Sequence, residues 1–322
     1  MRAIRVATNG GPEVLELGEV ELGEPGPGQL LVDVAAAGVN FIDTYQRSGI
    51  YSMELPFTPG SEGAGAVAAV GPDVDGFAVG DRVAWAMAPG SYAEKALVPA
   101  ASAVKVPDGV DDRTAAAAML QGMTAHYLIT STHEVSTGET ALVHAAAGGM
   151  GLLLTQLIKH KGANVIGTVS TDEKERLARA AGADEIIRYT DADVAAEVRD
   201  LTDGRAASTV YDGVGRTTFD ASLASLRPRG TLVLFGASSG PVPPFDPQRL
   251  NSGGSLFLTR PSLGHHLLSR DELDWRAGEV FGWITSGTID FRIGGTYSLD
   301  EARRAHEDLE GRRTTGKLLI LP

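Results

Sequence analysis

Short apolar runs separated by Gly and Pro fill the first third of the chain, from about Ala3 to Val106. They include QLLVDVAAAGVN (29–40), GAGAVAAVG (63–71), GDRVAWA (80–86) and YAEKALVP (92–99). Strand-length apolar runs bounded by turn residues are typical of β-structure. The pattern therefore predicts a β-rich, partly closed unit.

The rhythm changes at Thr140, where strand-length and helix-length runs begin to alternate. Strands are predicted at 140–144, 164–169, 185–189, 208–212 and 231–236. Helices are predicted at 150–162, 172–182, about 193–201 and about 217–226. Such alternation indicates βαβ units around a parallel sheet, and hence an α/β protein.

After about Pro261 the pattern loosens. It predicts a helix near 271–286, a second helix at 301–310 and a last strand in GKLLILP (316–322), and we expect this tail to return to the first unit. The predicted domains are 1–122, 123–260 and 261–322. The boundary near residue 120 falls in an Ala-rich helical segment rather than in a flexible linker.

Composition narrows the function classes. A chain of 322 residues is long enough for about two domains. The net charge of −13 argues against a broad face that binds nucleic acid. The absence of Cys excludes disulfides, thiolate metal sites and Cys nucleophiles, and it is typical of a reducing compartment. No signal-peptide-like start and no run of 18 apolar residues occur, so we expect a cytoplasmic protein without a membrane span.

The segment VHAAAGGMG (143–151) offers a ligand almost nothing but backbone. It follows a predicted strand and opens a predicted helix, which is the context of a dinucleotide-binding loop. Gly148 and Gly149 permit close approach of a pyrophosphate, and Gly151 permits tight packing of helix on strand. Ala146 departs from the fingerprint at its first glycine. The alternative interpretation is a purely structural strand–helix turn.

The end of the second predicted strand selects the nucleotide. NAD sites usually place a carboxylate there, whereas this chain has Ser170, with Lys174 one helical turn later. The hydroxyl and the cation favour NADP(H), although Asp172 and Glu173 are adverse charges. Ser170 and Glu173 also fit a helix capping box, and both roles are compatible. Tyr189 ends the third strand, where it either covers the adenosine or packs in the core.

Eight segments spread over nearly the whole chain resemble one family. The sequence is similar to the quinone oxidoreductases, the zinc-free, zeta-crystallin-like branch of the medium-chain dehydrogenase/reductase superfamily. The resemblance is carried by GGPEVLEL (10–17), GVNFIDTYQRSGIY (38–51), PGSEGAGAVAAVG (59–71), HAAAGGMGLL (144–153), IGTVST (166–171), VYDGVGR (210–216), FGASSG (235–240) and LTRPSL (258–263).

The resemblance implies a GroES-like catalytic domain and a Rossmann-type, doubly wound cofactor domain. It implies a homodimer that transfers reducing equivalents, as hydride or single electrons, from NADPH to a quinone. Relatives with this fold reduce enones or enals instead, which is the alternative function. A crystallin-like structural role or nucleic-acid binding is less favoured, because the cofactor loop is intact and the chain is acidic.

The resemblance also assigns site residues. It implies catalytic roles for Asn40, Tyr45, Tyr51 and Arg260. It implies cofactor contacts from Asn40, Phe41, Asp43, Thr124, Tyr127, Gly148, Gly149, Met150, Gly151, Ser170, Lys174, Tyr189, Gly213, Phe235, Gly236, Ser238, Arg260 and Lys317.

No metal is expected. Zinc-dependent relatives use Cys and a Gly-His-Glu element, whereas this chain has Gly60-Ser61-Glu62 and no Cys. The adjacent pair His265-His266 is interpreted as a surface or loop feature, and no Ser-His-Asp set is apparent.

Without a metal, side chains must hold the acceptor. Asn40 would donate to a carbonyl, Tyr51 would stack or donate, and Arg260 would meet developing negative charge. Each also has an ordinary reading: a turn residue for Asn40, packing for Tyr45 and Tyr51, and an interdomain ion pair for Arg260. Apolar strands near 233–241 and 254–259 are candidates for pairing across a dimer axis.

Overall fold

The computed structural model describes residues 1–322, which form two compact units. The first unit comprises Met1–Met123, Leu267–Gly287 and Phe291–Pro322, and the second comprises Thr124–His266 and Thr288–Asp290. No helix is both long enough and apolar enough to cross a membrane.

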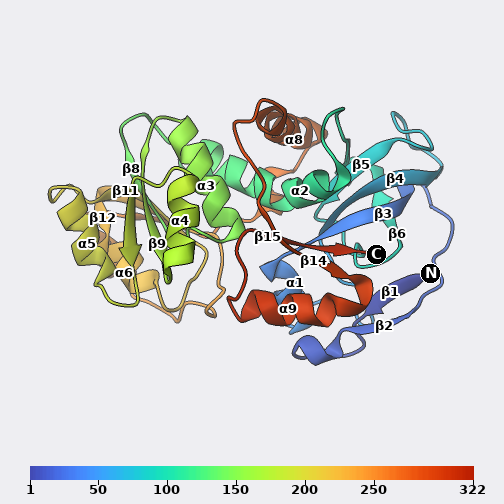
Figure 1. Ribbon diagram of the computed structural model, residues 1–322, viewed down its shortest axis with the longest axis horizontal. Coiled ribbons are helices and arrows are strands. Elements are labelled where there is room, and N and C mark those ends of the chain that lie inside the picture. Colours follow the sequence, from blue (N-terminus) through green and yellow to red (C-terminus); the bar gives the residue numbers. More distant parts are fainter. The chain divides into compact units, whose positions relative to one another are not determined.

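The first unit is built on a seven-stranded sheet, in the order β14-β15-β3-β4-β5-β7 with β6 also paired to β3 (Figure 1). Its long central strand is β3 (Gln29–Val39), whose neighbours run antiparallel to it. The last strand of the chain pairs with this strand, with Leu318 opposite Val39. The bounds are β4 (Glu62–Val70), β5 (Arg82–Ala86), β6 (Lys95–Pro99), β7 (Ala103–Lys105), β14 (Ile293–Ser298) and β15 (Lys317–Leu321).

Smaller elements complete the first unit. Strands β1 (Arg2–Arg5) and β2 (Glu16–Glu19) form an antiparallel pair. The helices are α1 (Phe41–Arg47), α8 (Arg270–Thr285), α9 (Ala302–Glu310) and most of α2 (Asp112–Tyr127), whose last turn belongs to the second unit. Short 3₁₀ turns are η1 (Pro12–Val14), η2 (Ala100–Ser102) and η5 (Leu299–Glu301).

The second unit is a six-stranded, fully parallel sheet in the order β10-β9-β8-β11-β12-β13. Helices α3 and α4 cover one face, and α5 and α6 cover the other (Figure 1). The strands are β8 (Thr140–Val143), β9 (Asn164–Val169), β10 (Glu185–Arg188), β11 (Ala207–Asp212), β12 (Leu226–Leu234) and β13 (Phe257–Thr259). The helices are α3 (Gly149–His160), α4 (Asp172–Ala180), α5 (Val194–Leu201), α6 (Phe219–Ala224), α7 (Gln248–Ser252) and the single turns η3 (Leu128–Thr132) and η4 (Leu263–His266).

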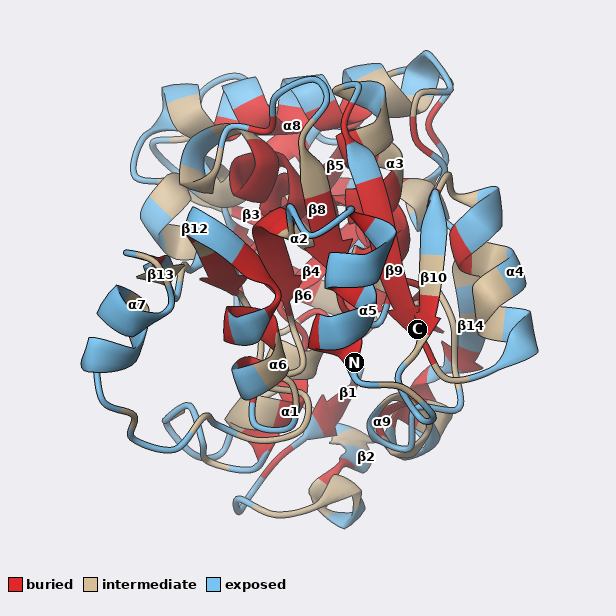
Figure 2. Ribbon diagram, turned by 90° about the vertical axis from the view of Figure 1, so that its left-hand side faces the viewer, coloured by how far each residue is buried: buried red, intermediate tan, exposed pale blue.

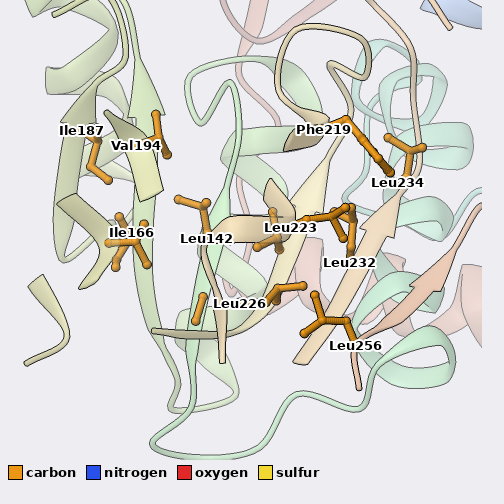
Figure 3. Close-up of a cluster of buried hydrophobic side chains, with 13 residues drawn as sticks. Leu142, Ile166, Ile187, Val194, Phe219, Leu223, Leu226, Leu232, Leu234 and Leu256 are labelled. Carbon is orange, nitrogen blue, oxygen red and sulfur yellow. The ribbon is translucent and has the colours of Figure 1, made fainter. Parts of the chain in front are cut away.

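Aliphatic side chains from strands and helices meet on the α5–α6 face of this sheet. Leu142, Ile166 and Leu232 come from three strands and pack with Leu223 of α6 (Figure 3). The central strands β8, β9 and β11 are almost wholly buried, whereas the edge strands β10 and β13 and the outer helix faces are more exposed (Figure 2). Burial of each such side chain stabilises the fold by roughly 1.5–3 kcal/mol. This packing fixes the strand ends that carry the loops described below.

The observed elements confirm the α/β fold class with a β-rich unit and a parallel sheet. The sequence pattern did not predict the β1–β2 pair, helices α1 and α7, or strand β14. Strand β12 begins at Leu226, earlier than the predicted residue 231, and α6 ends at Ala224. The polar start of β12, LRPRG, has no apolar alternation that could reveal a strand.

Candidate functional site

The glycine loop runs from β8 into α3 at the carboxyl edge of the parallel sheet, the edge at which ligands of such sheets bind. Helix α3 begins at Gly149, and its N-cap Gly148 makes no side-chain cap hydrogen bond. The first amides of a helix have no intrahelical partner and attract anions. Ala145, with φ of 51°, makes the left-handed turn of the loop.

Two glycines make close packing possible around this turn. A Cβ on Gly151 would lie 2.3 Å from the carbonyl oxygen of Ala145, so only glycine fits there. A Cβ on Gly167 in β9 would lie 2.8 Å from the methyl group of Ala146. The alanine that departs from the fingerprint is therefore accommodated by a glycine on the neighbouring strand.

The segment after β9 carries the predicted phosphate-selecting residues. Helix α4 is capped by Thr171, whose hydroxyl accepts a hydrogen bond from the amide of Lys174. The predicted capping box at Ser170 is therefore wrong, because Ser170 lies one residue outside the cap. Arg188 of β10 pairs with Asp172 and with Glu175. Its hydrogen bond lowers the pKa of Asp172, and hydrogen bonds from Arg179 and from Arg188 lower the pKa of Glu175. This pairing partly neutralises the acids beside Lys174.

The other predicted residues of the second unit lie on the last turn of α2 and on several loops. Tyr189, which follows β10, is 41% exposed. Tyr127 is buried, as is Thr124, and its ring stacks on His266 with centroids 4.1 Å apart. His265 is exposed, and His266 is half-buried in the short turn η4. Gly213 follows β11, residues 235–238 follow β12, and the exposed Arg260 follows β13.

A buried ion pair lies beside Asn40 in the first unit. Lys317 and Glu62 form a salt bridge with side chains only 1% and 0% exposed. The Lys317 ammonium also donates to Asn40 Oδ1 at 2.7 Å, and Asn40 Nδ2 donates to Glu62 Oε1 at 2.7 Å. Because lysine only donates and a carboxylate only accepts, these two bonds fix which way the Asn40 amide points. Glu62 Oε2 accepts from the Leu120 amide at 2.7 Å.

A second set of polar groups extends from the start of α1. Asn40 is its N-cap, and the backbone amide of Asn40 donates to Asp43 in a capping box. The Asp43 carboxylate also accepts from Ser61 Oγ at 2.7 Å and from the Tyr92 hydroxyl at 3.1 Å. The Tyr92 hydroxyl contacts His306 Nε2 at 3.1 Å. All of these side chains are buried.

Burial sets the protonation of this set. Desolvation raises the pKa of Asp43 to about 6, against the opposing effect of the Ser61 hydrogen bond. Desolvation lowers the pKa of His306 to about 3, and the neighbouring Arg47 charge acts in the same direction. Arg47 donates to His306 Nδ1 at 3.0 Å and is paired with Glu310 at 2.9 Å. His306 is therefore neutral at physiological pH.

Three aromatic rings lie along α1 and the segment after it. Tyr45 and Tyr51 pack edge to face with centroids 5.4 Å apart, and Phe41 lies 6.3 Å from Tyr45. Tyr51 is 41% exposed and its amide donates to the Tyr45 carbonyl at 3.0 Å. The structure thus brings Tyr45 and Tyr51 together, with Asn40 as the N-cap of the helix that carries Tyr45, whereas Arg260 belongs to the second unit.

The residues at the family's zinc-ligand positions do not fit zinc. Ser61 donates its hydroxyl to Asp43, and no cysteine is present. No group of three His, Cys, Asp or Glu side chains is arranged to hold a metal ion. Zinc sites in proteins need three or four such ligands. No chemistry is assigned to zinc here.

Two groups of residues were missed by sequence reasoning. Glu62 was considered only as part of the Gly60-Ser61-Glu62 element and was not predicted as a site residue. Nothing in its sequence context reveals its pairing with Lys317, 255 residues away. His144, Asp212 and Ser222 also converge, although no Ser-His-Asp set was apparent from the sequence. Here Ser222 lies between the other two, which is not the order of a hydrolase triad. The only sequence signal was that His144 and Asp212 stand in family segments, whereas nothing in the sequence pointed to Ser222.

Two family models match the chain. Residues 26–108 match the alcohol dehydrogenase GroES-like domain, and residues 149–276 match the zinc-binding dehydrogenase family.

The chain is also similar to curated proteins along its full length. It is 48% identical to the quinone oxidoreductase of Pseudomonas aeruginosa, over 100% of this chain and 99% of that protein. It is 42% identical to the 2-haloacrylate reductase of a Burkholderia species, over 97% and 96%. Among solved structures, the Escherichia coli quinone oxidoreductase complexed with NADPH is 41% identical, with a TM-score of 0.98 and full coverage of both chains.

Proposed function

Because the chain belongs to the quinone oxidoreductase branch of the medium-chain dehydrogenase/reductase superfamily, we propose that it is an NADPH-dependent quinone reductase that works without a metal. The observation that carries the proposal is full-length similarity to quinone oxidoreductases, one of them solved with NADPH. The bound cofactor would supply the hydride. The chain's own residues bind and orient the two reactants.

We assign the cofactor to the second unit. The amides at the start of α3 hold the pyrophosphate, as the bare loop and the uncapped helix start favour. Ser170 and Lys174 hold the 2′-phosphate, and Tyr189 covers the adenosine. The pairing of Arg188 with Asp172 and Glu175 supports this choice, since it reduces the negative charge near the phosphate.

We assign the acceptor to groups of the first unit, and we propose a catalytic role for Arg260 of the second unit. One Asn40 amide hydrogen is directed at Glu62, and the other makes only a 3.4 Å contact with the Gly38 carbonyl. That second hydrogen can be donated to an acceptor carbonyl, and Tyr51 offers a partly exposed ring for a flat substrate. Lys317 and Asp43 act indirectly, because both are buried and bonded to Asn40.

The roles of Arg260 and Asn40 are testable by substitution. A fixed donor helps most where negative charge develops, and losing one costs about 100- to 1000-fold at oxyanion sites. Quinones accept hydride readily, so we expect a smaller loss of kcat, about 10- to 100-fold, for Arg260→Ala. Asn40→Ala should act in the same direction. NADPH affinity measured separately distinguishes acceptor effects from cofactor effects. Wild-type turnover of every acceptor by both variants would refute these assignments.

The substrate class is the finer part of the proposal. Reduction of α,β-unsaturated carbonyl compounds is the second candidate, favoured by the similarity to 2-haloacrylate reductase. Initial rates with NADPH should be measured on a panel of quinones, enones, enals and 2-haloacrylates. We expect kcat/KM for the best quinone to exceed that for the best unsaturated carbonyl by at least about tenfold. The reverse order would assign the enzyme to the second class.

We also propose a homodimer formed through the edge of the parallel sheet. Strand β13 is the last strand of that sheet and carries Phe257, which is 61% exposed. Unpaired edges are usually covered or paired, and a two-fold axis would pair two such edges. Sedimentation at micromolar concentration should show a dimer that Phe257→Lys dissociates. Leu268→Lys, at an apolar residue that is 78% exposed in the first unit, is the control. A monomeric wild-type protein would contradict the proposal.

A further inference from the structure

Three strand ends of the second unit are joined by buried side chains that the proposed chemistry does not use. His144 follows β8, Thr168 lies near the end of β9, and Asp212 ends β11. Ser222, on α6, completes the set. The side chains of all four are at most 4% exposed. Their distances are 3.2 Å for His144 Nδ1 to Thr168 Oγ1, 3.0 Å for His144 Nε2 to Ser222 Oγ, and 2.7 Å for Ser222 Oγ to Asp212 Oδ2.

The hydrogen-bond donor of each pair in this set can be assigned by starting from Asp212. The Asp212 carboxylate only accepts, so the Ser222 hydroxyl donates to it. Ser222 must then accept from His144, which places the ring proton on Nε2. His144 Nδ1 is left as an acceptor, and it receives the Thr168 hydroxyl. Burial lowers the pKa of His144 and keeps the ring neutral, as this assignment requires.

The first donor of the series belongs to the glycine loop itself. The backbone amide of Ala145 donates to Thr168 Oγ1 at 3.2 Å, and the amide of Ala146 donates to the Thr168 carbonyl at 3.0 Å. A continuous series therefore runs from Ala145 through Thr168, His144 and Ser222 to Asp212. We call these five residues the Thr168–Asp212 chain.

The Thr168–Asp212 chain holds a strained residue. Ala145 has a φ of 51°, a left-handed conformation that is unfavourable for a residue with a Cβ. Such conformations persist only where the surroundings impose them. The Ala145 carbonyl accepts from the Gly148 amide at 2.9 Å and abuts Gly151, so its orientation sets the turn into α3.

The Asp212 end of the Thr168–Asp212 chain fixes a second loop. Asp212 accepts from the amides of Val214 and Gly215 at 2.8 and 3.0 Å, and from the Thr218 hydroxyl. This loop contains Gly213, one of the residues implied to contact the cofactor. One series of hydrogen bonds thus determines the backbone of two loops at the same edge of the sheet.

We propose that Thr168, His144 and Ser222 are positioning residues for the cofactor, which hold the glycine loop and the 213–215 loop in one fixed arrangement. This inference rests on the proposed function, since it assumes that these loops bind NADPH. None of the three side chains need contact the cofactor. Their loss should weaken NADPH binding in protein that is still folded.

The sharpest variant is Thr168→Val, which keeps the shape of the side chain and removes the hydroxyl. A matched control exists on β11: Thr209 is equally buried, at 1% exposure, but its hydroxyl has no hydrogen-bond partner. We expect Thr168→Val to raise the Kd for NADPH by about 5- to 30-fold, because a buried hydrogen bond is lost and two partners are left unsatisfied. Thr209→Val should leave the Kd unchanged, and Thr168→Ser should restore affinity.

Coupling between variants tests whether the residues act as one chain. Ser222→Ala should weaken NADPH binding to a similar degree, and the double variant Thr168→Val/Ser222→Ala should lose less than the product of the two single effects. NADPH binding would be measured by titration calorimetry, with urea unfolding measured separately. Ser222→Ala and Thr168→Ser remain informative should Thr168→Val not fold.

The outcomes are distinguishable. If wild-type protein does not bind NADPH, the proposed function itself fails. If it binds NADPH while Thr168→Val and Ser222→Ala bind equally well, the positioning role is wrong and the hydroxyls are only structural. An equal loss in Thr209→Val, or effects that multiply in the double variant, would likewise overturn it.

Discussion

The two units bury polar groups in opposite ways. The first unit buries charges directly: Lys317 against Glu62, with Asp43 and Arg47 nearby, all almost inaccessible to solvent. The second unit buries one carboxylate, Asp212, and surrounds it with hydroxyl and backbone donors. Removing one partner of a buried ion pair leaves a desolvated charge and costs about 3–5 kcal/mol, whereas removing one hydroxyl from a hydrogen-bonded set costs about 1–3 kcal/mol. The polar groups available to a ligand are therefore mainly side chains in the first unit and mainly backbone amides in the second.

The largest expected effect comes from breaking the buried ion pair. Lys317→Met leaves the buried Glu62 carboxyl without its cationic partner, which should lower the free energy of unfolding by about 3–5 kcal/mol. Adding Glu62→Gln should recover part of this loss. Arg304→Met, in an exposed pair with Glu301, is the control and should cost less than about 1 kcal/mol. Urea unfolding measures all of these. Equal losses in the buried and exposed pairs would contradict the comparison.

A smaller effect is expected on the cofactor side. Lys174→Ala should raise the KM for NADPH about 10- to 100-fold, because a charged hydrogen bond is worth about 1.5–3 kcal/mol. NADH has no 2′-phosphate, so its use should change little. Lys159→Ala, which removes a lysine paired with Asp184 at the far end of α3, is the matched control. The measurement is the steady-state rate with each nucleotide. Equal kcat/KM of the wild-type protein for NADPH and NADH would contradict the assignment of Ser170 and Lys174 to the 2′-phosphate.

The buried polar groups of the first unit should also make its stability depend on pH. Between about pH 4 and pH 6 the folded state keeps a proton on Asp43 that the unfolded chain loses, so this group makes stability fall as pH rises. His306 does the opposite between about pH 3 and pH 6.5, because the unfolded chain holds its proton and the folded state does not. The two contributions oppose each other in the shared window.

His306→Gln should remove only the second contribution. The slope of stability against pH between pH 4 and pH 6 should then become more negative than in the wild type, by roughly 1 kcal/mol per pH unit. Chemical unfolding at several pH values measures the slope. Parallel curves for the two proteins would show that His306 does not titrate as described.

The smallest change in kcat is expected for Tyr51, which we assign to the acceptor. Tyr51→Phe keeps the edge-to-face contact with Tyr45 and the partly exposed ring. If the ring acts by stacking, kcat should change by less than about threefold. The measurement is kcat and KM for a quinone, with NADPH affinity determined separately. A loss of kcat above about tenfold at unchanged NADPH affinity would instead identify the hydroxyl as a hydrogen-bond donor.

Features that depend on local pattern could be predicted from the amino-acid sequence alone. Alternation of strand and helix lengths from Thr140 onwards is a property of neighbouring residues, and it specified the parallel sheet and the glycine loop at its edge. It placed α3 and β9 within two residues of their observed bounds. The cap of α4 was misassigned by one residue, because Ser170 and Thr171 are both good cap residues and only the backbone decides between them.

Contacts between residues far apart in the sequence could be identified only from the tertiary structure. Asn40 was recognised as a site residue, yet its partners Glu62 and Lys317 lie 22 and 277 residues away. His144 and Ser222 are 78 residues apart and stand in different elements. Periodicity carries no information about such pairs, because it reports which face of an element is buried and not what lies opposite. The pairing follows from strand order and from the desolvation that makes buried polar groups find partners.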